Sequence, residues 1–254
     1  MASTGVGRGY SLPMLSLAAV YVGLFVLAPI CALVSRRREH ARDDWAWWVI
    51  SPIFTGSITR IATLAGFALL APTFSRSLTW PIASQIAAAL VVADVAGYLS
   101  HRVRHCRGLW ELHAVHHAST KLDWPAGARM HPLDDVVDNV FVGVVLLACG
   151  FDRAVFAAIG PILILHTMLT HLDVSWRFGP LRYVFVSPAM HRWHHARGNM
   201  RANFAGMFAF IDVAFGTFSL PDGEPGEFGS HVGHGVVRQL AHPFRAPFSS
   251  WRDT

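Results

Sequence analysis

The segment SPAMHRWHH, residues 187–195, places three histidines at positions i, i+3 and i+4: His191, His194 and His195. Residues three and four apart lie on one face of an α-helix, so this spacing predicts three imidazoles on a single face. Ser187 suits the N-cap position, Pro188 suits the first helical position, and Gly198 is placed to end the helix. We therefore predict a short helix that presents a cluster of imidazoles.

The same spacing occurs upstream in WELHAVHH, residues 110–117, and an i, i+4 pair occurs in HRVRH, residues 101–105. Single histidines follow in RMHPL, residues 129–133, and at position 171. Burying ten histidines near a membrane without hydrogen-bond or metal partners would cost free energy. The patterns together therefore predict metal binding. The predicted ligands are His101, His105, His113, His116, His117, His131, His171, His191, His194 and His195.

The number of histidines favours two metals over one. A structural zinc site is closed by four ligands, and ten candidates exceed that number. The sequence contains neither the HExxH motif of zinc proteases nor the HxE and PCxxC motifs of zinc deaminases. Imidazole also suits copper and nickel, so the ligands alone do not decide the metal, and we regard a pair of irons as the best fit.

Two polar residues precede the first histidine pair on the same helical stripe. Asp94, Tyr98, His101 and His105 are spaced by four, three and four positions. A carboxylate can orient a metal-binding imidazole through the second ring nitrogen. We expect Asp94 to have this role.

The composition indicates a membrane protein. Hydrophobic residues make up 53% of the 254 residues and charged residues only 15%, with a mean hydropathy of +0.38. A chain so poor in charge cannot easily cover a soluble surface. The formal net charge of +5 does not indicate nucleic acid, because the basic residues form no stripe with interleaved aromatic residues.

Three apolar segments have the length of membrane-spanning helices. Arg36, Arg37 and Arg38 follow the first segment, and the positive-inside rule places them in the cytoplasm together with the histidines. A tryptophan patch at 45, 47 and 48 suits the membrane interface. The predicted spans are Pro13–Val34, Ser57–Pro72 and Trp80–Leu99.

Two further apolar segments, 136–150 and 154–170, are flanked by histidines and predict a helical hairpin within 136–171. Residues 221–254 read as a C-terminal loop and tail. We therefore expect one all-α domain over residues 1–254. It is a multi-pass transmembrane helical bundle in which residues 13–99 hold three spans and residues 100–220 form a cytoplasmic, histidine-rich di-metal cap.

The motifs between Asp94 and Phe218 resemble those of the fatty acid hydroxylase and sterol desaturase superfamily. The match includes DVAGYLSHRVRH, WELHAVHH, RMHPL, His171, SPAMHRWHH, the NFAG segment at 203–206 and DVAFGT at 212–217. The family often has a polar residue after the histidine at 171, where this chain has Leu172, and a tighter Asn-Tyr-Gly in place of NFAG. The resemblance implies that the ten histidines bind two iron ions.

The resemblance also implies a membrane oxidoreductase that uses molecular oxygen to hydroxylate or desaturate a fatty acyl, sterol or related lipid. No catalytic residue beyond the metal ligands is expected. No GxGxxG motif is visible, so the electrons should come from an external donor, a ferredoxin or cytochrome b5-like carrier with its reductase. The alternative is a histidine-rich membrane protein for electron transfer or transport that binds haem or a metal.

Five histidines stay outside the predicted metal set. His40 lies among basic residues, and His166 is five positions before His171 and therefore points off its face. His231, His234 and His242 lie in the C-terminal loop and tail, where we expect them to be solvated.

Overall fold

The computed structural model describes residues 28–36, 42–51, 61–62, 65–66, 69 and 77–245. These residues form helices and loops without a strand, and only an isolated bridge joins Ala196 to Phe228. The prediction of a helical fold is thus confirmed for this part of the chain. The predicted spans 13–34 and 57–72 lie mostly outside it, as do Arg37, Arg38 and the tail beyond residue 245.

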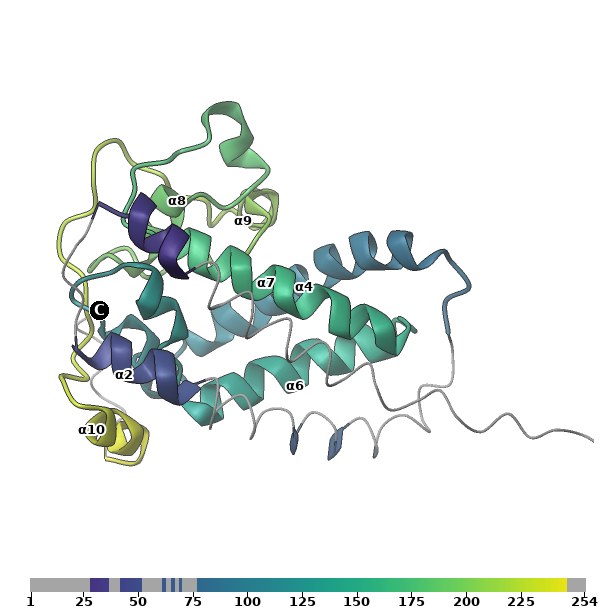
Figure 1. Ribbon diagram of the computed structural model, residues 1–254, viewed down its shortest axis with the longest axis horizontal. Coiled ribbons are helices and arrows are strands. Elements are labelled where there is room, and N and C mark those ends of the chain that lie inside the picture. The colour runs from purple at the N-terminus through teal and green to yellow at the C-terminus, as the bar shows by residue number, and fades with distance from the viewer. Residues whose placement is uncertain are drawn as a thin grey trace, which may run out of the picture.

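Three long helices form one elongated half of the molecule: α4 (Ile82–Arg104), α6 (Pro132–Ala148) and α7 (Arg153–His171). Helix α4 packs against both α6 and α7, and Figure 1 shows the three side by side. The 23 residues of α4 give it a length of about 35 Å. The third predicted span is therefore a helix that continues five residues further, past His101 to Arg104.

Helices α4 and α7 are long and apolar enough to cross a membrane. Only 33% and 28% of their apolar windows are buried, whereas the core helix of a soluble protein would be mostly buried. Large apolar side chains on the two helices face outward, among them Ile82, Leu99, Val103, Ile162 and Leu165. In the described part of the chain, these two helices thus have the length, the composition and the exposed apolar side chains of membrane-spanning helices.

Helices α6 and α7 run in opposite directions. Pro132, the first residue of α6, follows the N-cap His131, whose ring accepts a hydrogen bond from the Leu133 N–H. Asp152 is the N-cap of α7, and α7 ends at His171. The chain thus leaves the histidine-rich end along α6 and returns to it along α7.

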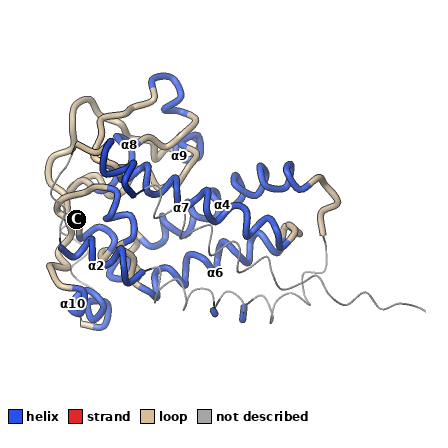
Figure 2. Tube along the Cα trace, in the orientation of Figure 1, coloured by secondary structure: helices blue, strands red, loops and turns tan. Residues whose placement is uncertain are grey.

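Shorter elements surround that end, where Figure 2 shows most of the loops. They are α2 (Arg42–Ile50), α5 (Trp110–His113), η2 (His116–Ala118), η3 (Trp124–Ala128), η4 (Gly179–Tyr183), α8 (Pro188–His195), α9 (Ala209–Phe215), α10 (Val236–Ala241) and η5 (His242–Phe244). Helix α8 begins as predicted, because the Ser187 hydroxyl accepts a hydrogen bond from the Met190 N–H. It ends at His195, three residues before Gly198, which has a φ of +82° in the following turn.

The tryptophans of α2 do not all lie where the sequence predicted them. Trp47 is completely buried, its indole N–H donates to Gln239 Oε1 at 2.6 Å, and it packs in one core cluster with Trp110. Trp45 and Trp48 lie edge-on against Trp124 of η3, at centroid distances of 5.4 and 4.9 Å. The prediction of an interfacial position is wrong for Trp47, because its polar N–H is satisfied inside the protein.

Buried polar contacts fasten the short elements to one another. Arg129 and Asp44 form a fully buried ion pair, and the Ser119 hydroxyl donates to the same carboxylate at 2.9 Å. Arg192 of α8 pairs with Asp173 at 2.9 Å. Because one partner of a buried ion pair cannot be removed without leaving an unpaired charge, these contacts hold the elements around the histidines in place.

Candidate metal centre

Nine histidine side chains meet at the end of the helical bundle in two groups. Within each group, the nitrogen atoms that could bind a metal lie within 4.8 Å of one another. The first group contains His101, His105, His113, His117 and His194. The second contains His116, His171, His191 and His195.

The two groups share their supporting segments. In each HxxHH array the i and i+4 histidines enter one group and the i+3 histidine enters the other. His113 and His117 thus join the first group while His116 joins the second, and the array on α8 has the opposite distribution. The rings of His117 and His195 stack at 4.3 Å where the groups adjoin. Each array therefore contributes to both groups at once.

Five of the nine imidazoles are oriented by their Nδ1 atoms. His101 bonds to the Phe204 carbonyl at 2.8 Å, His116 to the Arg129 carbonyl at 2.9 Å and His171 to the Thr167 carbonyl at 2.8 Å. His194 bonds to the Ala202 carbonyl at 2.7 Å. Because a carbonyl oxygen only accepts, each Nδ1 must carry the proton, which leaves the Nε2 lone pair free for a metal. The fifth, His113, is oriented by a carboxylate.

Several of the Nε2 atoms point at one another. His105 and His101 approach at 3.2 Å between Nε2 atoms, and His191 and His171 do the same at 3.2 Å. The Nε2 atoms of His113, His117 and His194 are buried without a hydrogen bond. Buried polar atoms are normally paired, so this concentration of lone pairs fits a site built for cations.

Burial also sets the protonation state of the histidines outside the long helices. Desolvation by burial, followed by the neighbouring imidazoles, lowers the pKa of His117 and His195 well below the usual value. Burial lowers the pKa of His194 to about 4. The imidazoles are therefore neutral near pH 7, and neutral imidazole is the form that binds metals.

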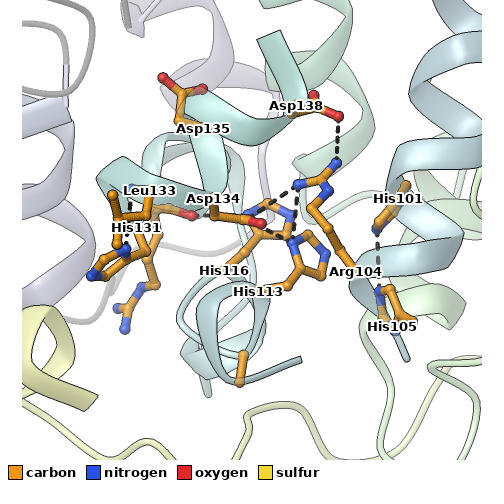
Figure 3. Close-up of polar contacts among 12 residues, drawn as sticks. His101, Arg104, His105, His113, His116, His131, Leu133, Asp134, Asp135 and Asp138 are labelled. Carbon is orange, nitrogen blue, oxygen red and sulfur yellow. Dashed lines mark hydrogen bonds and ion pairs between the residues drawn. The ribbon is translucent and has the colours of Figure 1, made fainter. Parts of the chain in front are cut away.

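Asp134 orients His113 and was missed in the sequence. Its Oδ2 atom lies 2.9 Å from His113 Nδ1 and accepts a hydrogen bond from Arg104 at 3.1 Å. Arg104 in turn pairs with Asp138 at 2.9 Å, as Figure 3 shows. The available signal was the pair of carboxylates at 134 and 138, one helical turn apart at the start of an apolar segment.

Asp94 does not orient an imidazole directly, so that prediction is corrected. Its carboxylate accepts hydrogen bonds from the backbone N–H groups of Gly206, Met207 and Phe208 at 2.6 to 3.1 Å. A methyl group on Gly206 would come within 3.1 Å of Asp94 Oδ1, so glycine permits this approach. Asp94 thereby holds the loop that carries Phe204, whose carbonyl orients His101.

The NFAG segment is the centre of this loop. Asn203 has a φ of +61°, and its side chain bonds to the Met190 carbonyl of α8 at 3.0 Å. Asp212 accepts hydrogen bonds from the N–H groups of Phe204 and Ala205 at 2.8 and 3.0 Å. The loop places two carbonyls, Ala202 and Phe204, against two histidines of the first group.

His131 belongs to neither group, in contrast to its place in the predicted ligand set. Its Nδ1 accepts the hydrogen bond that caps α6, and its Nε2 lies 3.2 Å from the Leu240 carbonyl. Both ring nitrogens thus have backbone partners. The structure makes His131 a helix cap and a contact to α10.

The match to known proteins covers the part of the chain that forms this centre. The model of the fatty acid hydroxylase family matches residues 86–217, which include all nine histidines of the two groups. The chain belongs to the fatty acid hydroxylase family. The resemblance drawn from the histidine motifs is thereby confirmed.

Curated proteins similar to this fatty acid hydroxylase family member include three lipid enzymes. Ornithine lipid hydroxylase OlsE of Rhizobium tropici is 34% identical over 65% of this chain and 52% of its own length. Human alkylglycerol monooxygenase is 28% identical over 61% of this chain and 33% of its own length. Methylsterol monooxygenase 1-3 of Arabidopsis thaliana is 26% identical over 54% and 48%, respectively.

The matched part of the family member thus spans about half of these relatives' length or less. No solved structure matches the chain. The comparisons establish the family and its association with lipid hydroxylases and monooxygenases.

Proposed function

We propose that this protein is a membrane-embedded, oxygen-dependent di-iron oxidoreductase that hydroxylates a lipid. The observation that carries the proposal is the pair of buried imidazole groups with their Nε2 atoms turned toward one another. Membership of a family whose relatives are named as lipid hydroxylases and monooxygenases supports it.

The proposed ligands are the nine histidines of the two groups, five for one iron and four for the other. His131 is left out because both of its nitrogens have backbone partners. Imidazole nitrogens suit divalent iron, and the neutral state set by burial is the state that binds it. When bound, two irons would activate molecular oxygen for attack on an unactivated C–H bond, which no side chain of the chain can do alone.

The side chains around the histidines would orient the ligands and exclude water. The Trp110 ring lies 5.1 Å from the His105 ring and 5.3 Å from the His117 ring. Phe204 covers His105 from another side at 5.2 Å. A dry site protects a reactive oxidant from side reactions with solvent, so we assign Trp110 and Phe204 to this role.

We propose that the whole chain forms one membrane-embedded domain with the histidine centre at the cytoplasmic side. The outward-facing apolar side chains of α4 and α7 support insertion in lipid. Arg36, which begins the basic segment after the first apolar run, pairs with Asp173, two residues after His171. This contact supports a shared side for the basic segment and the histidines.

Hydroxylation is favoured over desaturation because the relatives are named as hydroxylases or monooxygenases. The three names refer to an ornithine lipid, an alkylglycerol and a methylsterol, each of which has a large apolar part that would enter from the bilayer. We propose a lipid of this general chemistry as the substrate. Electrons would come from a separate ferredoxin or cytochrome b5-like carrier.

The test combines lipid analysis with iron quantification. Membranes that contain the protein, a reducing system and oxygen are supplied with an ornithine lipid, an alkylglycerol or a methylsterol, and products are measured by mass spectrometry. We expect one lipid to gain 16 mass units, and we expect His194→Ala to lose this product and bound iron.

His234→Ala is the matched control, because the His234 side chain is 73% exposed and lies in neither histidine group. A His194→Ala protein with full iron and full product would contradict the proposal, as would a haem absorption band in the purified protein.

A further inference from the structure

A third cluster of side chains that could hold a metal lies beside α5, separate from the nine histidines. Glu111 and His113 are two positions apart, so they leave this short helix in roughly opposite directions. His113 enters the first histidine group, whereas Glu111 meets His231 and His242 of the C-terminal segment. The sequence predicted solvated side chains for these two histidines; His231 is exposed as predicted, whereas the His242 side chain is only 13% exposed.

Both imidazoles point to the same oxygen of the Glu111 carboxylate. His231 Nε2 lies 3.0 Å from Glu111 Oε2, and His242 Nε2 lies 2.7 Å from the same atom. The two imidazole rings are 5.1 Å apart, and all three ligand atoms lie within 4.8 Å of one another. The three side chains come from α5, from the loop before α10 and from the first residue of η5.

We propose that Glu111, His231 and His242 form a third metal site that binds one divalent cation of the zinc type. Two imidazoles and one carboxylate are the protein ligands of several zinc sites in which a fourth position is open to water. The single carboxylate offsets one of the two positive charges, and first-row divalent metals favour such a nitrogen and oxygen set.

The exposure of the site suits an exchangeable ion. The His231 side chain is 30% exposed, whereas the Glu111 side chain is 7% exposed. A cation can therefore reach the cluster from solvent through His231 and meet a carboxylate that is mostly shielded from water. A shielded carboxylate attracts a cation more strongly than a solvated one does.

Protein contacts hold the backbone around the two histidines in position. The Ser230 hydroxyl donates to the Ala114 carbonyl at 2.7 Å, next to α5. Val232 packs in the core cluster that contains Trp110, and Gln239 of α10 accepts the Trp47 N–H. Ligands that are fixed before binding lose less conformational entropy when the ion arrives.

A metal at this site would fasten the C-terminal segment to the helix that also carries His113 and Trp110. Residues 231–242 would then be tied to α5 by metal–ligand bonds in place of two imidazole–carboxylate hydrogen bonds. The consequence is that the metal stabilises the folded chain, since it binds the folded arrangement and not the unfolded chain.

The experiment counts metal equivalents in the full-length, detergent-solubilised holoprotein. Zinc is titrated after iron loading, and bound metal is measured after removal of excess ion. We expect the parent protein to bind one more equivalent than His231→Ala or His242→Ala, whatever number of ions the nine-histidine centre holds. We also expect zinc to raise the melting temperature of the parent but not of these variants.

Two further variants make the result decisive. Glu111→Gln retains an oxygen that can accept the imidazole hydrogen bonds but loses the charge, so zinc affinity should fall at least about tenfold. His234→Ala removes a nearby, exposed loop histidine and should bind the additional equivalent as the parent does. Equal zinc binding by the parent, His231→Ala and Glu111→Gln would overturn the proposal, and so would the absence of an additional equivalent in the parent.

Discussion

The carboxylate of Asp134 lies 2.9 Å from Nδ1 of His113, so the first turn of α6 determines which nitrogen of a histidine on α5 is available to a metal. Since Arg104 bonds to the same oxygen, the carboxylate is held in place from α4 as well. Contacts among α4, α5 and α6 thus position one imidazole. This relationship gives the first prediction.

Asp134→Asn should lower the affinity for iron by about 10- to 100-fold, because a hydrogen-bond partner of a ligand tunes its orientation and basicity. The measurement is iron content after dialysis against graded chelator. Asp135→Asn is the matched control, since Asp135 carries the same charge but bonds to Asn139 and touches no histidine of either group. Equal iron loss in both variants would contradict a specific role for Asp134.

Replacing Asp94 should loosen the loop that orients His101. Asp94→Asn removes the charge from a carboxylate that accepts backbone hydrogen bonds, each of which is worth about 1.5 to 3 kcal/mol when the acceptor is charged. We expect a lower melting temperature and weaker iron binding. Asp152→Asn provides the comparison, because asparagine and aspartate serve equally well as N-caps and α7 should keep its stability.

Asparagine substitutions at His131 and His116 distinguish a histidine that caps a helix from a histidine that binds metal. His131→Asn should retain the full iron content, since asparagine is a good N-cap and His131 lies outside both groups. His116→Asn should lose iron, since its side chain lies in the second group. If both variants lost iron to the same extent, the ten-ligand set expected from the sequence would be right and the nine-ligand set would be wrong.

Acid should destabilise the metal-free protein. The pKa of His194 is about 4 in the folded chain and about 6.5 in an unfolded one, so below pH 6.5 the unfolded chain binds the proton first. The stabilising contribution is therefore present above pH 6.5 and is lost as the pH falls towards 4, by about 3 kcal/mol for this residue. The melting temperature of the chelated protein at pH 7 and pH 5 tests this. A higher value at pH 5 would contradict it.

Local patterns predicted the elements of this site better than they predicted its contacts. The N-cap Ser187 and the helix around residues 82–99 follow from short-range chemistry, and the structure confirms both. The partner of Asp94 lies 112 residues away, and helical periodicity cannot reveal a contact at that separation. Histidine spacing likewise predicted one face for each array, but not the division of each face between two groups.

The burial of Trp47 illustrates the same limit. Three tryptophans near a basic segment are typical of a membrane interface, and nothing local distinguishes the one that packs inside. Its position depends on Gln239, which lies 192 residues further along the chain. The role of Glu111 was hidden for the same reason, because its two partners follow 120 and 131 residues later.

The division of each HxxHH array between the two histidine groups has a consequence for how this protein could change during evolution. Neither histidine group can be removed by changing one array alone, because both arrays contribute side chains to both groups. If the two groups bind two irons as proposed, a descendant with one metal would need substitutions in both arrays. The interwoven arrangement therefore makes a mononuclear derivative of this scaffold difficult to reach by single substitutions.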